Sequence, residues 1–130
     1  MKIYVIVYDM FDGDCSYNRI IKAFTNDLDA EEFCSLCKAE SQRIHKEIEY
    51  HYEIHADELD EINSKVRDII YANGKLKKPK VLDFSKLPES IRRREIGDAE
   101  QEMLKSHKYD PDFRSLEDEY CYNIEEVELD

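Results

Sequence analysis

Glycine and proline are scarce in this 130-residue chain, which contains three of each and no tryptophan. Neither residue type occurs between residues 29 and 73, so 45 consecutive residues lack the two types that most often interrupt a helix. Long apolar runs are also absent: the longest, Ile3 to Tyr8, is too short to cross a bilayer, and the N-terminus shows no secretory signal. We therefore expect a cytoplasmic protein whose four cysteines are reduced.

The 45-residue run carries an apolar stripe whose period fits one long helix. Two rows of residues recur at intervals of eleven, or three helical turns at about 3.67 residues per turn. The first row is Phe33, Ile44, His55 and Val66, and the second is Cys37, Ile48, Leu59 and Ile70. We predict a single helix over residues 29–73, about 65 Å long at about 1.5 Å per residue. The apolar stripe on the far half of this helix must be buried against another surface. The candidates are this chain's own C-terminal region, a second copy of the protein or a foreign partner.

Capping signals mark both ends of the predicted helix. The side chain of Asn26 or Asp27 can accept hydrogen bonds from the free N–H groups of the first turn. Gly74 follows the last turn, where glycine commonly ends a helix in the left-handed conformation. The prediction is therefore a helix that starts just after Asp27 and stops at Gly74.

The remaining segments predict a small sheet and a second helix. Residues 2–8 are β-branched and aromatic, Asp12-Gly13-Asp14 signals a turn, and residues 19–25 follow as a second strand. Alternation across residues 120–129 predicts a third strand, with a bulge, beside the first. The positions that set this alternation are Tyr122, Ile124, Val127 and Leu129.

Between the long helix and the last strand we expect an extended connector over residues 75–88 and a helix from Pro88 or Ser90 to about His107. The connector carries Val81, Leu82, Phe84 and Leu87, which could lie along an apolar groove. The apolar side of the second helix would comprise Ile91, Ile96, Ala99, Met103 and Leu104. The expected fold class is α+β: one domain, 1–130, with a three-stranded sheet packed on the start of the long helix.

This pattern resembles a group of small bacterial and phage ββαβ proteins of unknown function. The likeness rests on residues 1–6, a second strand ending at residues 23–25, a helix that opens at residues 29–33, and a terminal strand at residues 122–129. It implies a ββαβ core formed by 1–40 and 119–130, with 41–118 as a helical elaboration that carries any special function. It also implies a bacterial host cell, and it names no catalytic residue.

Two arrangements look like metal or redox motifs. Cys34 and Cys37 precede His51 and His55 at the spacing of a zinc finger, yet the residues between the pairs contain no turn former. On a continuous helix Cys37 and His51 would stand about 21 Å apart, so one ion cannot bridge them. Cys34 also lies more than one turn inside the helix, where the dipole does not activate a thiol. We predict no metal and no cofactor, with buried structural thiols and packed or interfacial histidines.

Charge is the other strong feature, because the chain has a formal net charge of −12. Residues 75–94 run against this trend, with eight basic and two acidic residues. An acidic chain repels nucleic acid and attracts basic surfaces, so we expect no direct nucleic-acid binding by most of the protein. The basic segment either contacts phosphate or neutralises the protein's own acidic helix.

These observations favour a non-catalytic protein that binds and inhibits a basic nucleic-acid-handling protein, with a CRISPR effector nuclease as one target class. The predicted partner-binding residues are Asp57, Glu58, Asp60, Glu61, Asp98, Glu100 and Glu102. The alternative is a self-associating scaffold or regulatory module, a homodimer paired through the long helix. Its contact residues would be Ile44, Ile48, His51, His55, Leu59, Ile62 and Val66. A metal-dependent or redox enzyme is the third hypothesis.

Overall fold

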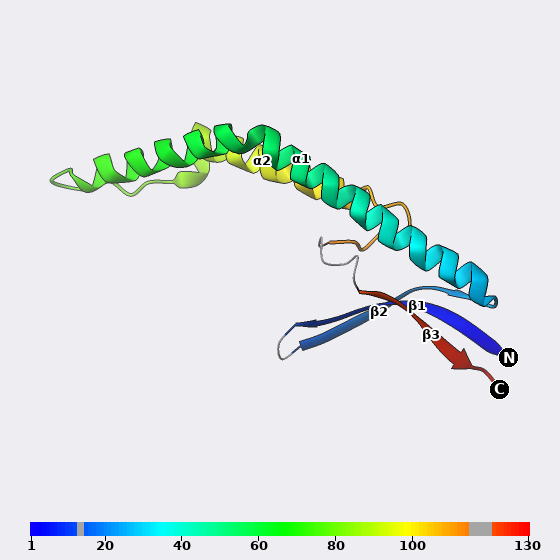
Figure 1. The fold of residues 1–130 in the computed structure, drawn as a ribbon. Coiled ribbons are helices and arrows are strands. Elements are labelled where there is room, and N and C mark those ends of the chain that lie inside the picture. Colours follow the sequence, from blue (N-terminus) through cyan, green and yellow to red (C-terminus); the bar gives the residue numbers. More distant parts are fainter. Residues whose placement is uncertain (13–14, 115–120) are drawn as a thin grey trace. The chain divides into compact units, whose positions relative to one another are not determined.

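The computed structural model describes residues 1–12, 15–114 and 121–130 (Figure 1). Its elements are β1 (Lys2–Asp12), β2 (Cys15–Phe24), α1 (Asp27–Gly74), the short 3-10 helix η1 (Phe84–Lys86), α2 (Pro88–Lys105) and β3 (Tyr122–Glu128). The fold is α+β, as predicted, with a three-stranded sheet packed against the start of the long helix. Within the described ranges, no helix is both long and apolar enough to cross a membrane.

The sheet has the order β2-β1-β3, and both pairs of neighbours are antiparallel. The predicted pairing of the last strand with the first is confirmed, since Tyr8 lies opposite Tyr122 and Lys2 lies opposite Glu128. The bulge predicted in the last strand is wrong, because β3 keeps one register throughout. The irregularity lies instead between β1 and β2, at Ile6 and Val7. The predicted turn at 12–14 and the predicted strand start at residue 120 fall largely outside the described residues.

The single long helix is confirmed, with 48 residues from Asp27 to Gly74. Asn26 caps it: its side-chain oxygen accepts from the backbone N–H groups of Leu28 at 2.8 Å and of Asp29 at 3.3 Å. The left-handed cap predicted at Gly74 is wrong, because Gly74 does not adopt a positive φ. The helix ends by tightening instead, as Lys75 donates to the Ala72 carbonyl and Leu76 to that of Asn73.

The second helix is confirmed at its start and ends two residues before the predicted His107. Proline suits its first position because its φ is already helical and no N–H is needed there. Ile91 was placed on the apolar side in error, since it is 41% exposed, whereas Ile96 and Leu104 are buried. In the connector, Val81 and Phe84 are also exposed and do not lie in an apolar groove. The connector is held instead by Asn73, whose side chain donates to and accepts from the backbone of Lys80.

The chain divides into two compact units. Unit 1 comprises Met1–Glu47 and Met103–Asp130, and unit 2 comprises Ile48–Glu102, so α1 contributes to both. The core of unit 1 lies where one face of the sheet meets the first turns of α1. Its members are Ile6, Tyr8, Ala30, Cys34, Cys37 and Tyr122.

Candidate functional site

Unit 2 is a helical hairpin that contains all of the predicted partner-binding residues. Its α1 segment and α2 run antiparallel, because contacts that move up α1 move down α2 (Figure 1). His51 contacts Ile96 and Tyr52 contacts Glu100, whereas Glu58 and Asn63, farther along α1, contact Arg92 and Arg93. The chain therefore covers its own long helix from His51 to about Asn63, whereas Ile70 and Tyr71 near the end of α1 are 49% and 66% exposed.

The interior of the hairpin uses the apolar stripe. Ile48, Ile62 and Ile96 are 2–6% exposed. His51 is buried as well, and its Nε2 lies 2.9 Å from the carbonyl oxygen of Ile96, so that nitrogen carries the hydrogen and donates it. The ring therefore satisfies a buried carbonyl near the middle of α2.

The stripe proposed for self-association is largely occupied within one chain. Ile48, His51 and Ile62 are buried inside unit 2, and Ile44 is fully buried inside unit 1. The other three predicted residues are half-buried: His55, Leu59 and Val66. Because burial within the chain removes a side chain from the free surface, a second copy has little of this stripe left to contact.

The two histidines of the stripe lie one turn apart, with ring centroids 4.8 Å from each other. The ring of His55 also faces the carboxylate of Glu58 at 3.3 Å. Cys37 and His51 lie on the same continuous helix, so the two pairs of the zinc-finger spacing do not converge. Among the described residues, no three histidine, cysteine or acidic side chains form a group that could hold a metal ion.

The predicted partner-binding residues differ in how far other side chains neutralise them. Glu58 accepts a hydrogen bond from the guanidinium of Arg92. This bond lowers the pKa of the Glu58 carboxyl and outweighs partial desolvation, which would raise it. Glu61 lies 3.1 Å from the ammonium of Lys65. Glu100 accepts a hydrogen bond from the hydroxyl of Tyr52, and this bond, with burial, raises the pKa of Tyr52 to about 12. Each of these three carboxylates therefore already has a partner within unit 2.

The remaining predicted residues are exposed, namely Asp57, Asp60, Asp98 and Glu102. Within the described part of the chain, Asp57, Asp60 and Asp98 make no ion pair or hydrogen bond. Their side chains are exposed to solvent, and Asp60 also lines a hollow with Arg67 and Arg93. They are the carboxylates on which a basic partner could act most directly.

Charge is segregated along the hairpin. Residues 48–64 contain six acidic and no basic residues, and residues 95–102 contain four acidic and no basic residues. These two segments lie side by side, because His51 and Tyr52 contact Ile96 and Glu100. Residues 65–94 reverse the sign with ten basic and three acidic residues. We call the two acidic segments the acidic end of the hairpin and residues 65–94 its basic end.

A buried polar network in unit 1 went unrecognised in the sequence. The Asp110 carboxylate accepts hydrogen bonds from both terminal nitrogens of Arg19, one of them at 2.6 Å. It also accepts a hydrogen bond from the hydroxyl of Tyr122. Burial opposes ionisation of Asp110, yet these hydrogen bonds outweigh it and hold its pKa below the ordinary value. Burial and the same bond raise the pKa of Tyr122. No sequence signal indicates this pairing, because Asp110 stands before a proline in a predicted loop.

His107 extends this network toward α1. Its Nδ1 accepts from the backbone N–H groups of Tyr109 and Asp110, and its Nε2 lies 3.2 Å from both the Ser41 hydroxyl and the Cys37 carbonyl. The hydroxyl of Ser41 donates to the same Cys37 carbonyl. Because Nδ1 is an acceptor here, no carboxylate orients this imidazole as in a serine or cysteine nucleophile triad. Through these hydrogen bonds, His107 attaches the segment that follows α2 to the long helix.

The paired cysteines have the environment predicted for structural thiols. Cys34 and Cys37 are free and buried. Burial raises the pKa of the Cys37 thiol to about 12, and it raises the pKa of Cys34 as well. Because the thiolate is the reactive form, these groups are suited to packing rather than to nucleophilic or redox chemistry.

Comparisons with known proteins identify no relative of the chain: no family model, no curated protein and no solved structure matches it.

Proposed function

We propose that this protein is a non-catalytic binding protein whose acidic end engages a basic nucleic-acid-handling protein and inhibits it. The acidic end occupies the basic channel through which such an enzyme holds its nucleic acid. A phage-type inhibitor of a bacterial defence nuclease, including a CRISPR effector nuclease, is the form of this proposal that we favour.

The observation that carries the proposal is the concentration of carboxylates on two adjacent helical segments. Ten acidic residues and no basic ones lie on residues 48–64 and 95–102. A surface of one sign raises the local concentration of oppositely charged partners and speeds their association. Because helices hold their side chains at fixed intervals, the charges form an array, as phosphates do along a nucleic-acid strand.

Three of these carboxylates provide the sharpest test. Asp57, Asp60 and Asp98 are exposed and, among the described residues, lack charged partners, so they can be neutralised without breaking the hairpin. A triple variant with Asp57→Asn, Asp60→Asn and Asp98→Asn changes the net charge by three. A matched control is the triple variant Glu32→Gln, Asp112→Asn and Glu125→Gln, which makes the same change on exposed residues of unit 1.

The experiment begins with affinity capture by the tagged protein from nuclease-treated bacterial lysate that contains candidate defence nucleases, followed by mass spectrometry. The captured enzyme is then purified and its cleavage measured against the wild-type protein and both triple variants. We expect inhibition that weakens with salt, since exposed charges are screened within about 8 Å at physiological ionic strength. The hairpin triple variant should lose at least about tenfold in inhibitory potency and the control less than about threefold.

Two results would refute this function. One is the absence of any basic nucleic-acid enzyme among the captured proteins at low salt. The other is equal loss of inhibition in both triple variants, because net charge alone would then account for the effect. A concentration-dependent dimer in analytical ultracentrifugation would favour self-association, which has less support because four of its seven proposed contact residues are buried within the chain.

A further inference from the structure

The arginines of this protein fall into two groups. Four of them face a carboxylate within 4.0 Å: Arg19, Arg43, Arg92 and Arg114. Across the ranges that the structure describes, the other three have no ion pair: Arg67, Arg93 and Arg94. The chain has a net charge of −12, and these three arginines all belong to the basic end of the hairpin.

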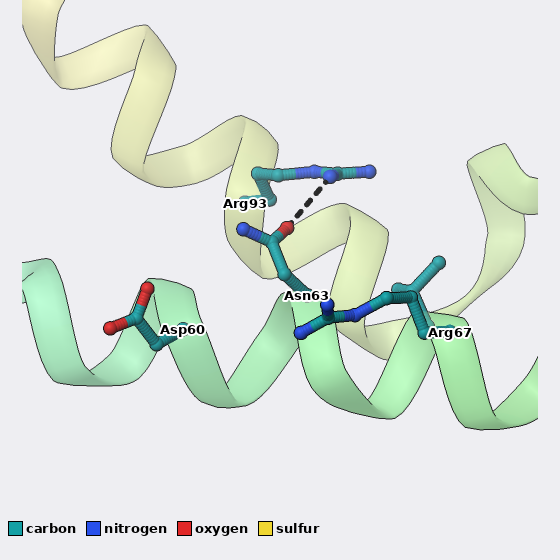
Figure 2. A pocket seen from close by; sticks show the side chains of 5 residues that line it. Asp60, Asn63, Arg67 and Arg93 are labelled. Carbon is teal, nitrogen blue, oxygen red and sulfur yellow. Dashed lines mark hydrogen bonds between the residues drawn. The ribbon is translucent and has the colours of Figure 1, made fainter.

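The same three arginines line two hollows of unit 2. The first hollow has a volume of about 450 Å³ and is lined by Asp60, Asn63, Val66, Arg67 and Arg93. Figure 2 shows that Arg67 extends along α1 toward Asn63, while Arg93 reaches across from α2. The guanidinium of Arg93 donates one hydrogen bond, of 3.0 Å, to the side-chain oxygen of Asn63 (Figure 2). Most of its donors therefore remain unused.

The second hollow shares Arg93 with the first. Its volume is about 310 Å³, and its lining consists of Phe84, Ser85, Ser90, Arg93 and Arg94. No acidic residue lines it. Arg94 makes a single contact, to the backbone carbonyl of Ser85 at 3.5 Å.

Ser90 supplies a second, independent sign that this hollow is built for a polar ligand. The residue is 8% exposed, and its hydroxyl oxygen is buried without any hydrogen-bond partner. Leaving a buried hydroxyl unpaired is unfavourable, so such groups usually have a partner. Ser90 lies in the first turn of the 18-residue helix α2, where free N–H groups and the helix dipole also favour an anion.

We propose that the two hollows form one site for a ligand that carries a diphosphate group. Guanidinium groups bind phosphoryl oxygens with two parallel hydrogen bonds, and three of them are available here. Arg93, which lines both hollows, would contact both phosphoryl groups. The second hollow is the stronger subsite because Asp60 opposes an anion in the first. The first hollow adjoins the acidic end of the hairpin at Asp60 and Asn63, whereas none of the residues that line the second hollow belongs to the acidic end, and the proposed diphosphate site does not depend on the proposed function.

The test is isothermal titration calorimetry of the full chain with sodium pyrophosphate, inorganic phosphate, ADP and citrate at constant ionic strength. We expect pyrophosphate to bind at least tenfold more tightly than inorganic phosphate. Arg93→Gln should weaken pyrophosphate binding at least tenfold, and Arg94→Gln should weaken it as well. Arg114→Gln, which removes the same charge from an exposed site of unit 1, should change it less than twofold.

Two further variants separate a built site from general electrostatic attraction. Arg93→Lys keeps the charge and removes the planar fork of donors, so we expect it to bind several-fold more weakly than wild type. Asp60→Asn should tighten binding more than Asp57→Asn does, because only Asp60 lines a hollow. Helical content measured by circular dichroism checks that each variant is folded.

Several outcomes would overturn the proposal. They are equal affinity for pyrophosphate and inorganic phosphate, equal losses in Arg93→Gln and Arg114→Gln, and tighter binding of citrate than of pyrophosphate. Binding of a single-stranded oligonucleotide without any binding of pyrophosphate would also overturn it. If the site is confirmed, a higher affinity for ADP than for pyrophosphate identifies the ligand as a nucleotide, and the reverse order identifies inorganic diphosphate.

Discussion

Replacing Asp110 with asparagine tests how strongly the buried ion pair of unit 1 stabilises the fold. The side chain of Asp110 is fully buried, and that of Arg19 is 15% exposed. Asparagine has nearly the same shape but no charge, so the variant removes the carboxylate charge that both terminal nitrogens of Arg19 contact. The hydroxyl of Tyr122 also loses its charged acceptor.

The expected cost is about 3 to 5 kcal/mol, the range typical of removing one partner of a buried ion pair. Domains of this size are stable by only about 5 to 15 kcal/mol, so the change is a large fraction of the total. With a denaturant slope of about 1.5 kcal/mol/M, the urea midpoint of unit 1 should fall by roughly 2 to 3 M.

The assay must report on unit 1 rather than on the hairpin. Cys37 is fully buried in the core of unit 1, so its alkylation during a short pulse follows the unfolding of that unit. Mass spectrometry of the Cys37 peptide, measured across a urea series, gives the midpoint. Asp112→Asn is the matched control, because Asp112 is exposed and lies 4.0 Å from Arg114, so its midpoint should change by less than about 0.7 M.

A double-mutant cycle with Arg19→Met makes the reasoning refutable even if Asp110→Asn unfolds the unit almost completely. The double variant removes both charges of the pair, so it should be more stable than the two single effects predict, by at least about 1 kcal/mol. Additive effects in this cycle, or a loss of less than about 1 kcal/mol in Asp110→Asn, would show that the pair contributes no more than a surface ion pair.

Acidification should destabilise unit 1 in two steps, because burial lowers the pKa of His107 and hydrogen bonds lower that of Asp110 despite its burial. As the pH falls, each group takes up its proton in the unfolded chain before it does so in the folded protein. The free energy of unfolding therefore decreases below about pH 6.5 and again below about pH 4. The measurement is the urea midpoint of the near-ultraviolet tyrosine signal, and His107→Gln should abolish the first decrease. In the hairpin, Ile48→Ala should cost about 2 to 4 kcal/mol in urea unfolding followed by circular dichroism, because Ile48 is 2% exposed. Ile54→Ala, at a position that is 57% exposed, should cost less than about 0.5 kcal/mol, and equal costs would contradict the packing described here.

The long helix could be predicted closely because its signals are local. An absence of breakers and an eleven-residue period depend only on helix geometry, and the observed bounds differ from the predicted 29–73 by two residues at the start and one at the end. Alternation predicts the last strand in the same local way, but it does not specify which strand lies beside it. Gly74 shows the limit of such signals, since the side chain of Asn73 engages Lys80 and a tight final turn replaces the expected cap.

The polar network and the proposed anion site depend on contacts that composition does not reveal. Arg19 and Asp110 are 91 residues apart in the chain, and no spacing rule links a strand residue to a loop residue at that distance. Arg92, Arg93 and Arg94 look equivalent in the sequence. On a helix, however, successive side chains point about 100° apart, so Arg92 meets Glu58 while Arg93 and Arg94 line the hollows.

The central position of β1 has a consequence for the order in which this protein folds during synthesis. One neighbour of β1 follows it at once, but the other, β3, is contributed by the opposite end of the sequence. Unit 2 is continuous in sequence, and its helical contacts can form as soon as residue 102 has left the ribosome. Tyr122 completes the core of unit 1 only later. We therefore expect the hairpin to form first. Until β3 is added, β1 and β2 form a two-stranded ribbon, and the edge of β1 that later pairs with β3 stays open to chaperones.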